Sequence, residues 1–209
     1  PAWQYWFPSH ISALAVGHGM TVAGTVDGWL EGVDTDGNRL FQFSPGGSRL
    51  PVVLGVDVSA SGTWIAAVSG IDRQRLVVMG RGGADFRVSS HRYLDSDYRE
   101  PVRVNILDDD FNILYRRPDG IGVWSVDGTI DNVIPVPADD FDVEDDESNG
   151  IAYLALQRGS GAEIAVFKKP ARLLGRFALP PGTGFIRLSG STAFFGGDSW
   201  IARLDFIKE

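Results

Sequence analysis

Short apolar runs separated by glycine-containing turns recur along the whole chain at a nearly constant interval. Each repeat begins with a similar strand motif, and the central residues of the five copies are Ala15, Asp57, Asn105, Asp142 and Arg187. The runs alternate or are rich in β-branched residues, whereas no window of useful length has apolar residues at helical spacing. The pattern therefore predicts an all-β chain built from five similar units.

The interval itself points to an architecture. The motifs are about 43 residues apart on average, and a period of about 40 to 45 residues with four strands per repeat is typical of one blade of a β-propeller. We expect a single propeller domain over residues 1–209. Its predicted blades are 11–45, 52–94, 101–137, 140–180 and 184–209, with 2–7 added to the last.

The fifth repeat provides only three strands, and Trp3–Phe7 looks like the missing fourth. This segment stops at Pro8, much as Arg39–Phe43 precedes Pro45 and Leu174–Leu179 precedes Pro180. We expect it to pair with Trp200–Phe206 and so close a five-bladed ring, because an open ring would expose strand edges and apolar faces. The alternatives are a fragment of a six- or seven-bladed ring, or another sandwich or barrel.

The glycine-punctuated strands and the Val-Asp-Thr-Asp-Gly-Asn turn at residues 33–38 resemble the repeats of WD40-like, YVTN-type and quinoprotein-type propellers. The segment Val123–Gly128 comes nearest to the WD40 signature but lacks its Trp-Asp pair. The resemblance implies a rigid disc that binds proteins or peptides on a flat face. It does not imply a quinone for this chain.

Composition excludes several partners. The formal net charge is −8 and the 19 basic residues form no block, which argues against nucleic acid. There is no cysteine, so disulfides and thiolate metal sites are excluded, and no apolar stretch is long enough to span a bilayer. The sequence starts at Pro1 and not at a methionine, so the chain is either processed or trimmed, and a removed signal or anchor could have preceded it. We expect an extracytoplasmic location (periplasm or cell envelope), as the exported domain of an anchored protein, with a cytoplasmic location as the alternative.

No familiar catalytic or metal-binding motif is present, and we expect no cofactor and no metal. The three histidines, His10, His18 and His91, have no spacing that suggests shared ligation. The acidic stretches 139–147 and 108–110 could gather a calcium ion if they met on one face. The simpler interpretation is a pair of solvated loops that keep the protein soluble.

Polar residues on the predicted inner strands should approach the central axis. They are Asp57, Arg103, Asn105, Asp142 and Arg187. We interpret them as a structural ring in which arginines neutralise aspartates, since an unpaired buried charge is costly. The alternative is a carbohydrate-active enzyme of the five-bladed glycoside hydrolase type, in which Asp57 and Asp142 would serve as acid and base.

The connection between the second and third repeats, His91–Pro101, is the longest and mixes Arg with Tyr, two residue types enriched at protein hot spots. We expect a non-catalytic interaction or sensor module that binds a protein or peptide here. The predicted contact residues are His91, Arg92, Tyr93, Asp97, Tyr98 and Arg99.

Overall fold

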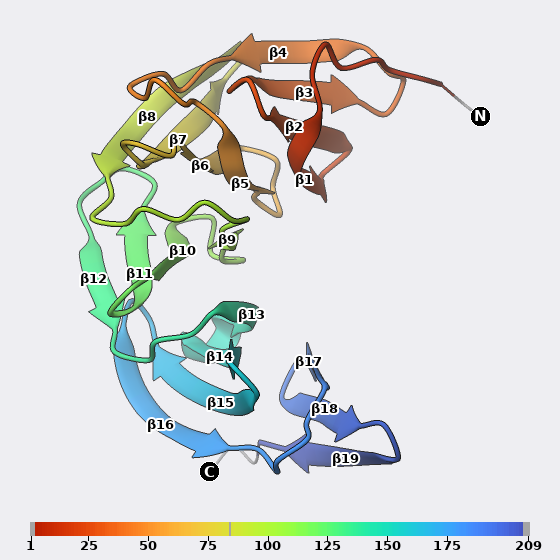
Figure 1. Ribbon diagram of the computed structural model, residues 1–209, viewed down its shortest axis with the longest axis vertical. Coiled ribbons are helices and arrows are strands. Elements are labelled where there is room, and N and C mark those ends of the chain that lie inside the picture. Colours follow the sequence, from red (N-terminus) through yellow and green to blue (C-terminus); the bar gives the residue numbers. More distant parts are fainter. Residues whose placement is uncertain (1–2, 84, 207–209) are drawn as a thin grey trace. The chain divides into compact units, whose positions relative to one another are not determined.

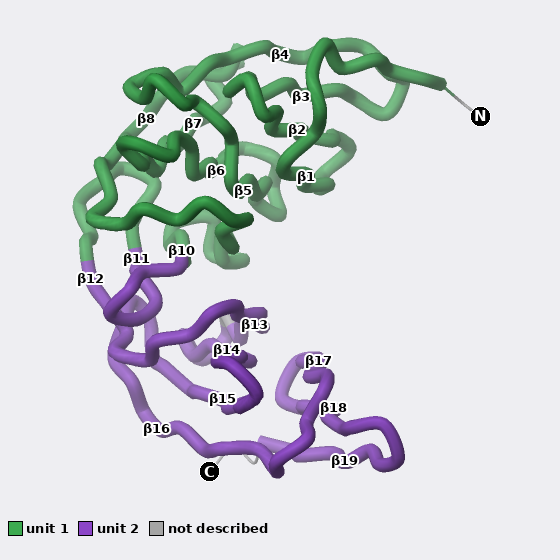
Figure 2. Tube along the Cα trace, in the orientation of Figure 1, with its two compact units in different colours: residues 1–115, 124–131 green, residues 116–123, 132–209 purple. Residues whose placement is uncertain are grey.

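The computed structural model describes residues 3–83 and 85–206. These residues form five antiparallel sheets of three or four strands, in agreement with the five predicted repeats (Figure 1). The chain divides into two compact units, residues 1–115 with 124–131 and residues 116–123 with 132–209 (Figure 2). Each unit is described here by itself.

The first two sheets belong to the first unit. Each contains four strands in sequence order, so each strand pairs with the next through a short turn. The first sheet consists of β1 (Ile11–Gly17), β2 (Met20–Thr25), β3 (Leu30–Asp34) and β4 (Arg39–Phe43). The second consists of β5 (Val53–Val58), β6 (Trp64–Ser69), β7 (Arg75–Gly82) and β8 (Asp85–Tyr93).

The third sheet contributes strands to both units and again runs in sequence order. It consists of β9 (Val104–Ile106), β10 (Asn112–Arg117), β11 (Gly120–Ser125) and β12 (Asp131–Ile134). All four strands lie within the third predicted blade, residues 101–137.

The fourth and fifth sheets belong to the second unit. The fourth consists of β13 (Asp140–Asp146), β14 (Ile151–Arg158), β15 (Gly161–Lys168) and β16 (Arg172–Ala178), with the short 3-10 turn η1 (Glu147–Asn149) after β13. The fifth has three strands, β17 (Phe185–Ser189), β18 (Thr192–Gly197) and β19 (Trp200–Asp205). A core cluster that includes Ile164, Ile186 and Phe195 joins the two sheets.

Both faces of the second sheet are covered, which explains why β7 reads as a continuous apolar run. Val77 and Met79 pack in a cluster with residues of the first sheet, such as Val22 and Leu30. Leu76 and Val78 point the other way, into a cluster that contains residues of β9 and β10. Successive strand residues alternate between faces, so a strand between two cores needs apolar side chains at every position.

One hydrogen-bonded turn recurs five times in the first unit and provides a structural repeat independent of the sheets. In each copy the N–H of the first residue donates to the carbonyl four or five positions later, and the carbonyl of the first residue accepts from a residue with positive φ. The first residues are Thr25, Asp34, Ser59, Leu107 and Ser125, and the positive-φ residues are Gly28, Gly37, Gly62, Asp110 and Gly128. In three copies the first residue is a fully buried Ser or Thr whose hydroxyl oxygen accepts a further main-chain hydrogen bond.

The aromatic segment Trp3–Phe7 forms no strand of its own unit's sheets. The Tyr5 hydroxyl donates to Glu31 Oε2 at 2.7 Å, and the Trp3 side chain lies against Gly37. Glu31 pairs with Ala23, on the face of the first sheet opposite the Val22 cluster, and both residues are fully buried. The segment therefore lies on this face of the first sheet through Trp3 and the half-buried Tyr5, whereas the Trp6 side chain is 81% exposed.

Candidate interaction site

The connection that follows β8 is held in place by Gln74, a residue that sequence reasoning missed. Gln74 immediately precedes β7 and is only 1% exposed. Its carbonyl accepts from the Leu94 N–H at 2.9 Å, its Oε1 accepts from the Ser96 hydroxyl at 2.6 Å, and its Nε2 donates to the carbonyl of Tyr98. One buried amide thus fixes the path of five residues that contain no regular structure.

The side chains of this connection divide between core and solvent. Tyr98 is half-buried and packs against the cluster that contains Leu54 and Tyr115. Asp95, Asp97 and Arg99 are exposed. The connection therefore exposes charged side chains, while its backbone is held by the hydrogen bonds to Gln74 and by the packing of Tyr98 against the core.

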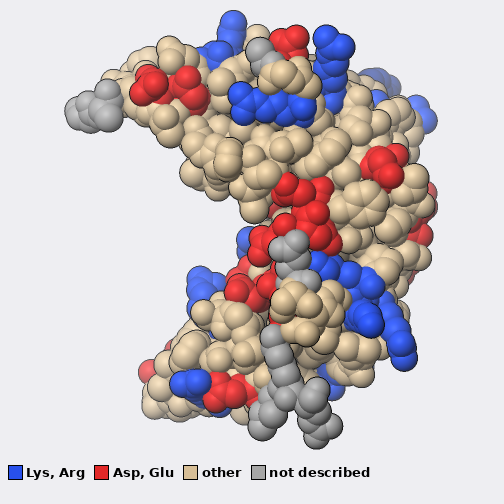
Figure 3. All heavy atoms as spheres, turned by 180° about the vertical axis from the view of Figure 1, so that it is seen from behind, with Lys and Arg blue, Asp and Glu red and all other residues tan. Residues whose placement is uncertain are grey.

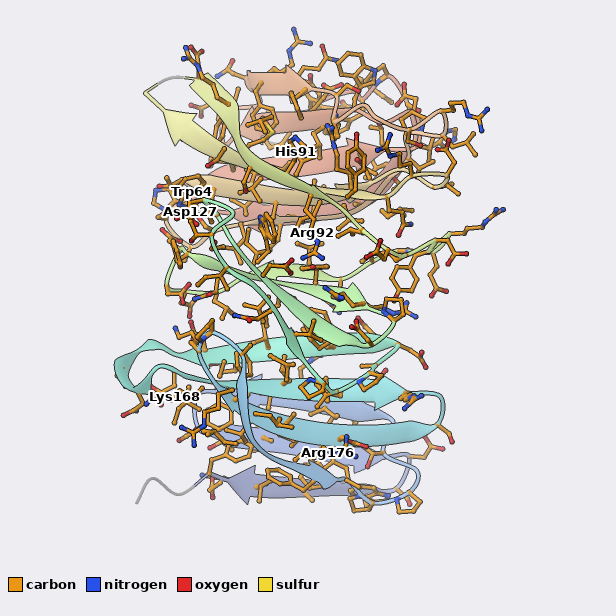
Figure 4. All side chains as sticks on the ribbon, turned by 90° about the vertical axis from the view of Figure 1, so that its left-hand side faces the viewer. Trp64, His91, Arg92, Asp127, Lys168 and Arg176 are labelled. Carbon is orange, nitrogen blue, oxygen red and sulfur yellow. The ribbon has the colours of Figure 1, made fainter. Side chains whose placement is uncertain are left out.

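Strand alternation separates the predicted contact residues of β8 (Figure 4). Arg92 pairs with Leu76 and lies on the face toward the third sheet, where it forms an ion pair with Asp131 and lies 5.5 Å from the Trp124 ring. His91 and Tyr93 lie on the other face, with ring centroids 6.1 Å apart. The six residues predicted as one contact site are thus divided between two faces and a connection.

Tyr93 gathers two arginines that the sequence analysis did not single out. The Arg73 guanidinium lies 3.9 Å from the centre of the Tyr93 ring, and that of Arg75 lies 5.8 Å away. Arg75 is the cross-strand partner of Tyr93. Counting outward from a Gly82-Gly83 corner would place residue 75 opposite residue 90. In the structure Gly82 pairs with Asp85 and the register shifts between Val78 and Met79, so this contact could not be read from the sequence.

Among the predicted axial residues, Asp57 links two inner strands. Asp57 lies on β5, and its Oδ2 accepts from the Ile106 N–H of β9 at 2.7 Å. Burial raises the pKa of Asp57 to about 6, although the hydrogen bonds from Ile106 and Val58 and the charge of Arg103 act in the opposite direction. Asn105 lies on β9, and its Oδ1 is buried without a hydrogen-bond partner among the described residues.

The other two axial residues lie in the second unit. Arg187 Nη1 on β17 is 4.0 Å from Asp142 Oδ2 on β13; the Arg187 side chain is largely exposed and that of Asp142 is partly exposed. This is a loose ion pair near the surface, which contributes little to stability.

The acidic stretch 139–147 is not a loop, because residues 140–146 form the strand β13. Its carboxylates have protein partners: Asp139 accepts from the Gly159 N–H, Glu144 from the Gly190 N–H, and Asp145 pairs with Lys169 at 2.9 Å. In the second acidic stretch, Asp109 caps the turn before β10 by accepting from the N–H groups of Phe111 and Asn112. Within residues 3–83 and 85–206, no three His, Asp or Glu side chains are grouped as they would be around a metal ion.

Charged residues of both signs lie among neutral ones on the face shown in Figure 3. No helix in the described part of the chain has the length and apolar character needed to cross a membrane.

Comparison with known proteins gives the family but no activity. A protein of Treponema pallidum (strain Nichols), described as uncharacterized, is 26% identical over 206 residues, which cover 97% of this chain and 54% of that protein. The chain therefore spans about half the length of this relative. A family model described as "beta-propeller protein" matches residues 1–209. Together with the five sheets, this match shows that the chain belongs to the β-propeller family.

Proposed function

We propose that this propeller is a non-catalytic interaction module that binds a protein or peptide at the surface formed by β8 and the connection 94–101. The observation that carries this proposal is the anchoring of the connection by Gln74, which fixes the backbone while Asp95, Asp97 and Arg99 remain exposed. A loop that is ordered before binding loses less conformational entropy in a complex than a mobile one. Exposed Tyr93, at the start of the connection, adds a residue type that often dominates binding energy.

The test is partner capture by the intact protein in an extract of its source, with chemical cross-linking and mass spectrometry. The informative variant is Asp97→Ala/Arg99→Ala, which removes two exposed charges of opposite sign without touching the core. Lys168→Ala/Asp198→Ala removes the same charges from exposed positions of the second unit and is the matched control. We expect Asp97→Ala/Arg99→Ala to lose one cross-linked partner that Lys168→Ala/Asp198→Ala still captures. Equal capture by both variants contradicts the proposed surface.

We also propose that Trp3–Phe7 is the fourth strand of the fifth blade, so that five blades close into a ring. Two observations support this. The segment resembles Arg39–Phe43 and Leu174–Leu179, which coincide with the fourth strands β4 and β16. It also lies on the outward face of the first sheet, and neighbouring propeller blades pack face to face.

Because the chain contains no cysteine, strand pairing can be tested by introducing cysteine pairs. One cysteine is placed at Gln4 or Trp6 and the other at Ile201 or Arg203, which gives four combinations. Closure within one chain predicts that at least one combination forms an intramolecular disulfide under mild oxidation. Disulfides only between chains, or none in any combination, contradict it.

A further inference from the structure

Two arginines beside Tyr93 have no polar partner within the described protein. Neither the Arg73 nor the Arg75 side chain forms a hydrogen bond or ion pair with another described residue. The Arg75 Nε atom is buried, yet it has no hydrogen-bond partner. Leaving a charged donor buried and unsatisfied is unfavourable by an amount comparable to a lost charge-assisted hydrogen bond, so such a group is a reason to look for a ligand.

The loop between β4 and β5 forms the opposite wall. Gly47 has φ of 81°, and a Cβ added to it would lie 3.1 Å from the Tyr93 hydroxyl and 3.5 Å from Arg75 Nη1. A side chain at position 47 would therefore fill the approach to both groups. At Gly46, by contrast, an added Cβ would have no neighbour within 4 Å, so the loop is open to solvent next to the arginines.

The nearest carboxylate in sequence is already engaged. Asp72 accepts hydrogen bonds from the Ser48 hydroxyl and from the main chain and Nε of Arg49, and these interactions hold its pKa below the usual range. It is therefore ionised, but its charge is directed to Arg49 and does not neutralise Arg73 or Arg75.

We propose that Arg73, Arg75 and the Tyr93 hydroxyl bind a side-chain carboxylate from an acidic segment of the partner, an inference that rests on the proposed function. A guanidinium presents parallel N–H donors that match the two oxygens of a carboxylate. Stacking of Arg73 on the Tyr93 ring orients that guanidinium before the ligand arrives. The two guanidiniums provide positive charge and donors but no acceptors, so the site selects anions over neutral amides.

The direct test is a fluorescence anisotropy titration of the intact protein with fluorescein-labelled hexaglutamate, with hexaglutamine as the neutral counterpart. We expect hexaglutamate to bind and hexaglutamine not to bind. Arg75→Gln should weaken binding about ten-fold or more, and Tyr93→Phe should weaken it about three-fold. The matched control is Arg87→Gln. It removes an exposed arginine from β8, the strand that carries Tyr93.

Three results would overturn the site. They are equal binding of the two peptides, equal weakening by Arg75→Gln and Arg87→Gln, and binding of inorganic phosphate without binding of hexaglutamate. Thermal unfolding of each variant shows whether it is folded. If Arg75→Gln does not fold, Tyr93→Phe still tests whether the site binds hexaglutamate.

The partner-capture assay separates this inference from the proposed function. If the wild-type protein captures a partner and Arg75→Gln captures it equally well, the carboxylate site is wrong and the interaction module stands. If hexaglutamate binding depends on Arg75 but no partner is captured at all, the site stands and the proposed function is wrong.

Discussion

The side-chain amide of Gln74 donates a hydrogen bond to the main-chain carbonyl of Tyr98, 24 residues further along the chain. The same side chain accepts from Ser96, so a single buried residue at the start of β7 determines the course of the connection after β8. The candidate interaction surface is therefore built by the second sheet and is not a freely moving linker.

Gln74→Ala should release this connection. The change removes two side-chain hydrogen bonds, so we expect the free energy of unfolding to fall by about 1–3 kcal/mol. Amide hydrogen exchange in residues 94–98 should become faster, because those amides lose their fixed surroundings. Gln157→Ala, at an exposed position of β14, is the control and should change neither quantity. Unchanged exchange in Gln74→Ala would contradict the anchoring role.

Asp57 should make the protein less stable as the pH rises from about 4 to 6. Burial raises its pKa from 3.8 to about 6, so in this range the native state holds a proton that the unfolded state has lost. This difference in pKa contributes at most about 3 kcal/mol to the free energy of unfolding. The contribution is fully present below pH 4 and is lost by pH 7.

Asp57→Asn keeps an acceptor for the Ile106 N–H but removes the charge. We expect urea unfolding of this variant to show a flatter dependence on pH between 4 and 7 and a higher stability at pH 7 than the wild type. Asp198→Asn, at an exposed turn, should leave the pH dependence as it is. An unaltered slope in Asp57→Asn would show that Asp57 is not the group responsible.

Asp110→Gly should stabilise the protein by about 0.5–1 kcal/mol, because a residue with a Cβ is strained in the left-handed region. Asp110 has φ of 53° and takes the place that Gly62 takes in the corresponding turn of the second sheet. The converse change, Gly62→Ala, should destabilise, since its Cβ would come within 2.8 Å of the His18 side chain as well. Denaturant midpoints measure both changes, and a loss of stability in Asp110→Gly would contradict the equivalence of the turns.

Tyr5→Phe should lower the free energy of unfolding by about 1–2 kcal/mol, because it removes a hydrogen bond to the buried carboxylate of Glu31. Gln42 Nε2, at 3.1 Å from Glu31 Oε1, would remain as a donor. Burial and the hydrogen bond to Glu31 raise the pKa of Tyr5, so the phenol keeps its proton at neutral pH. In a protein that already carries Glu31→Gln, Tyr5→Phe should lower the free energy of unfolding by less than it does in the wild-type protein. Strict additivity would mean that the two side chains do not interact.

The sequence predicted the strands well because alternation and glycine turns are local signals. The five turns led by Thr25, Asp34, Ser59, Leu107 and Ser125 each close through hydrogen bonds within six residues, so their positions could be identified from a short segment. The contacts that build the candidate site could not be identified in this way. Its key contacts join residues more than 15 positions apart, as in Gln74 with Tyr98 and Arg75 with Tyr93.

His91, Arg92 and Tyr93 were treated as one contact surface, but a strand sends its neighbouring side chains to opposite faces. The contact between the Tyr5 hydroxyl and the buried Glu31 was not predicted either, because it joins residues 26 positions apart that no local pattern connects. The pairing of Trp3–Phe7 with Trp200–Phe206 stays a prediction.

We infer that the arginines beside Tyr93 and the connection anchored by Gln74 form one binding surface. Hydrogen–deuterium exchange of the intact protein with and without hexaglutamate tests it most directly. With hexaglutamate bound, we expect slower exchange in residues 45–50, 73–75 and 91–98 of the wild-type protein. We expect no such change in Arg75→Gln. Unchanged exchange there in the wild-type protein, or equal protection in Arg75→Gln, would contradict it.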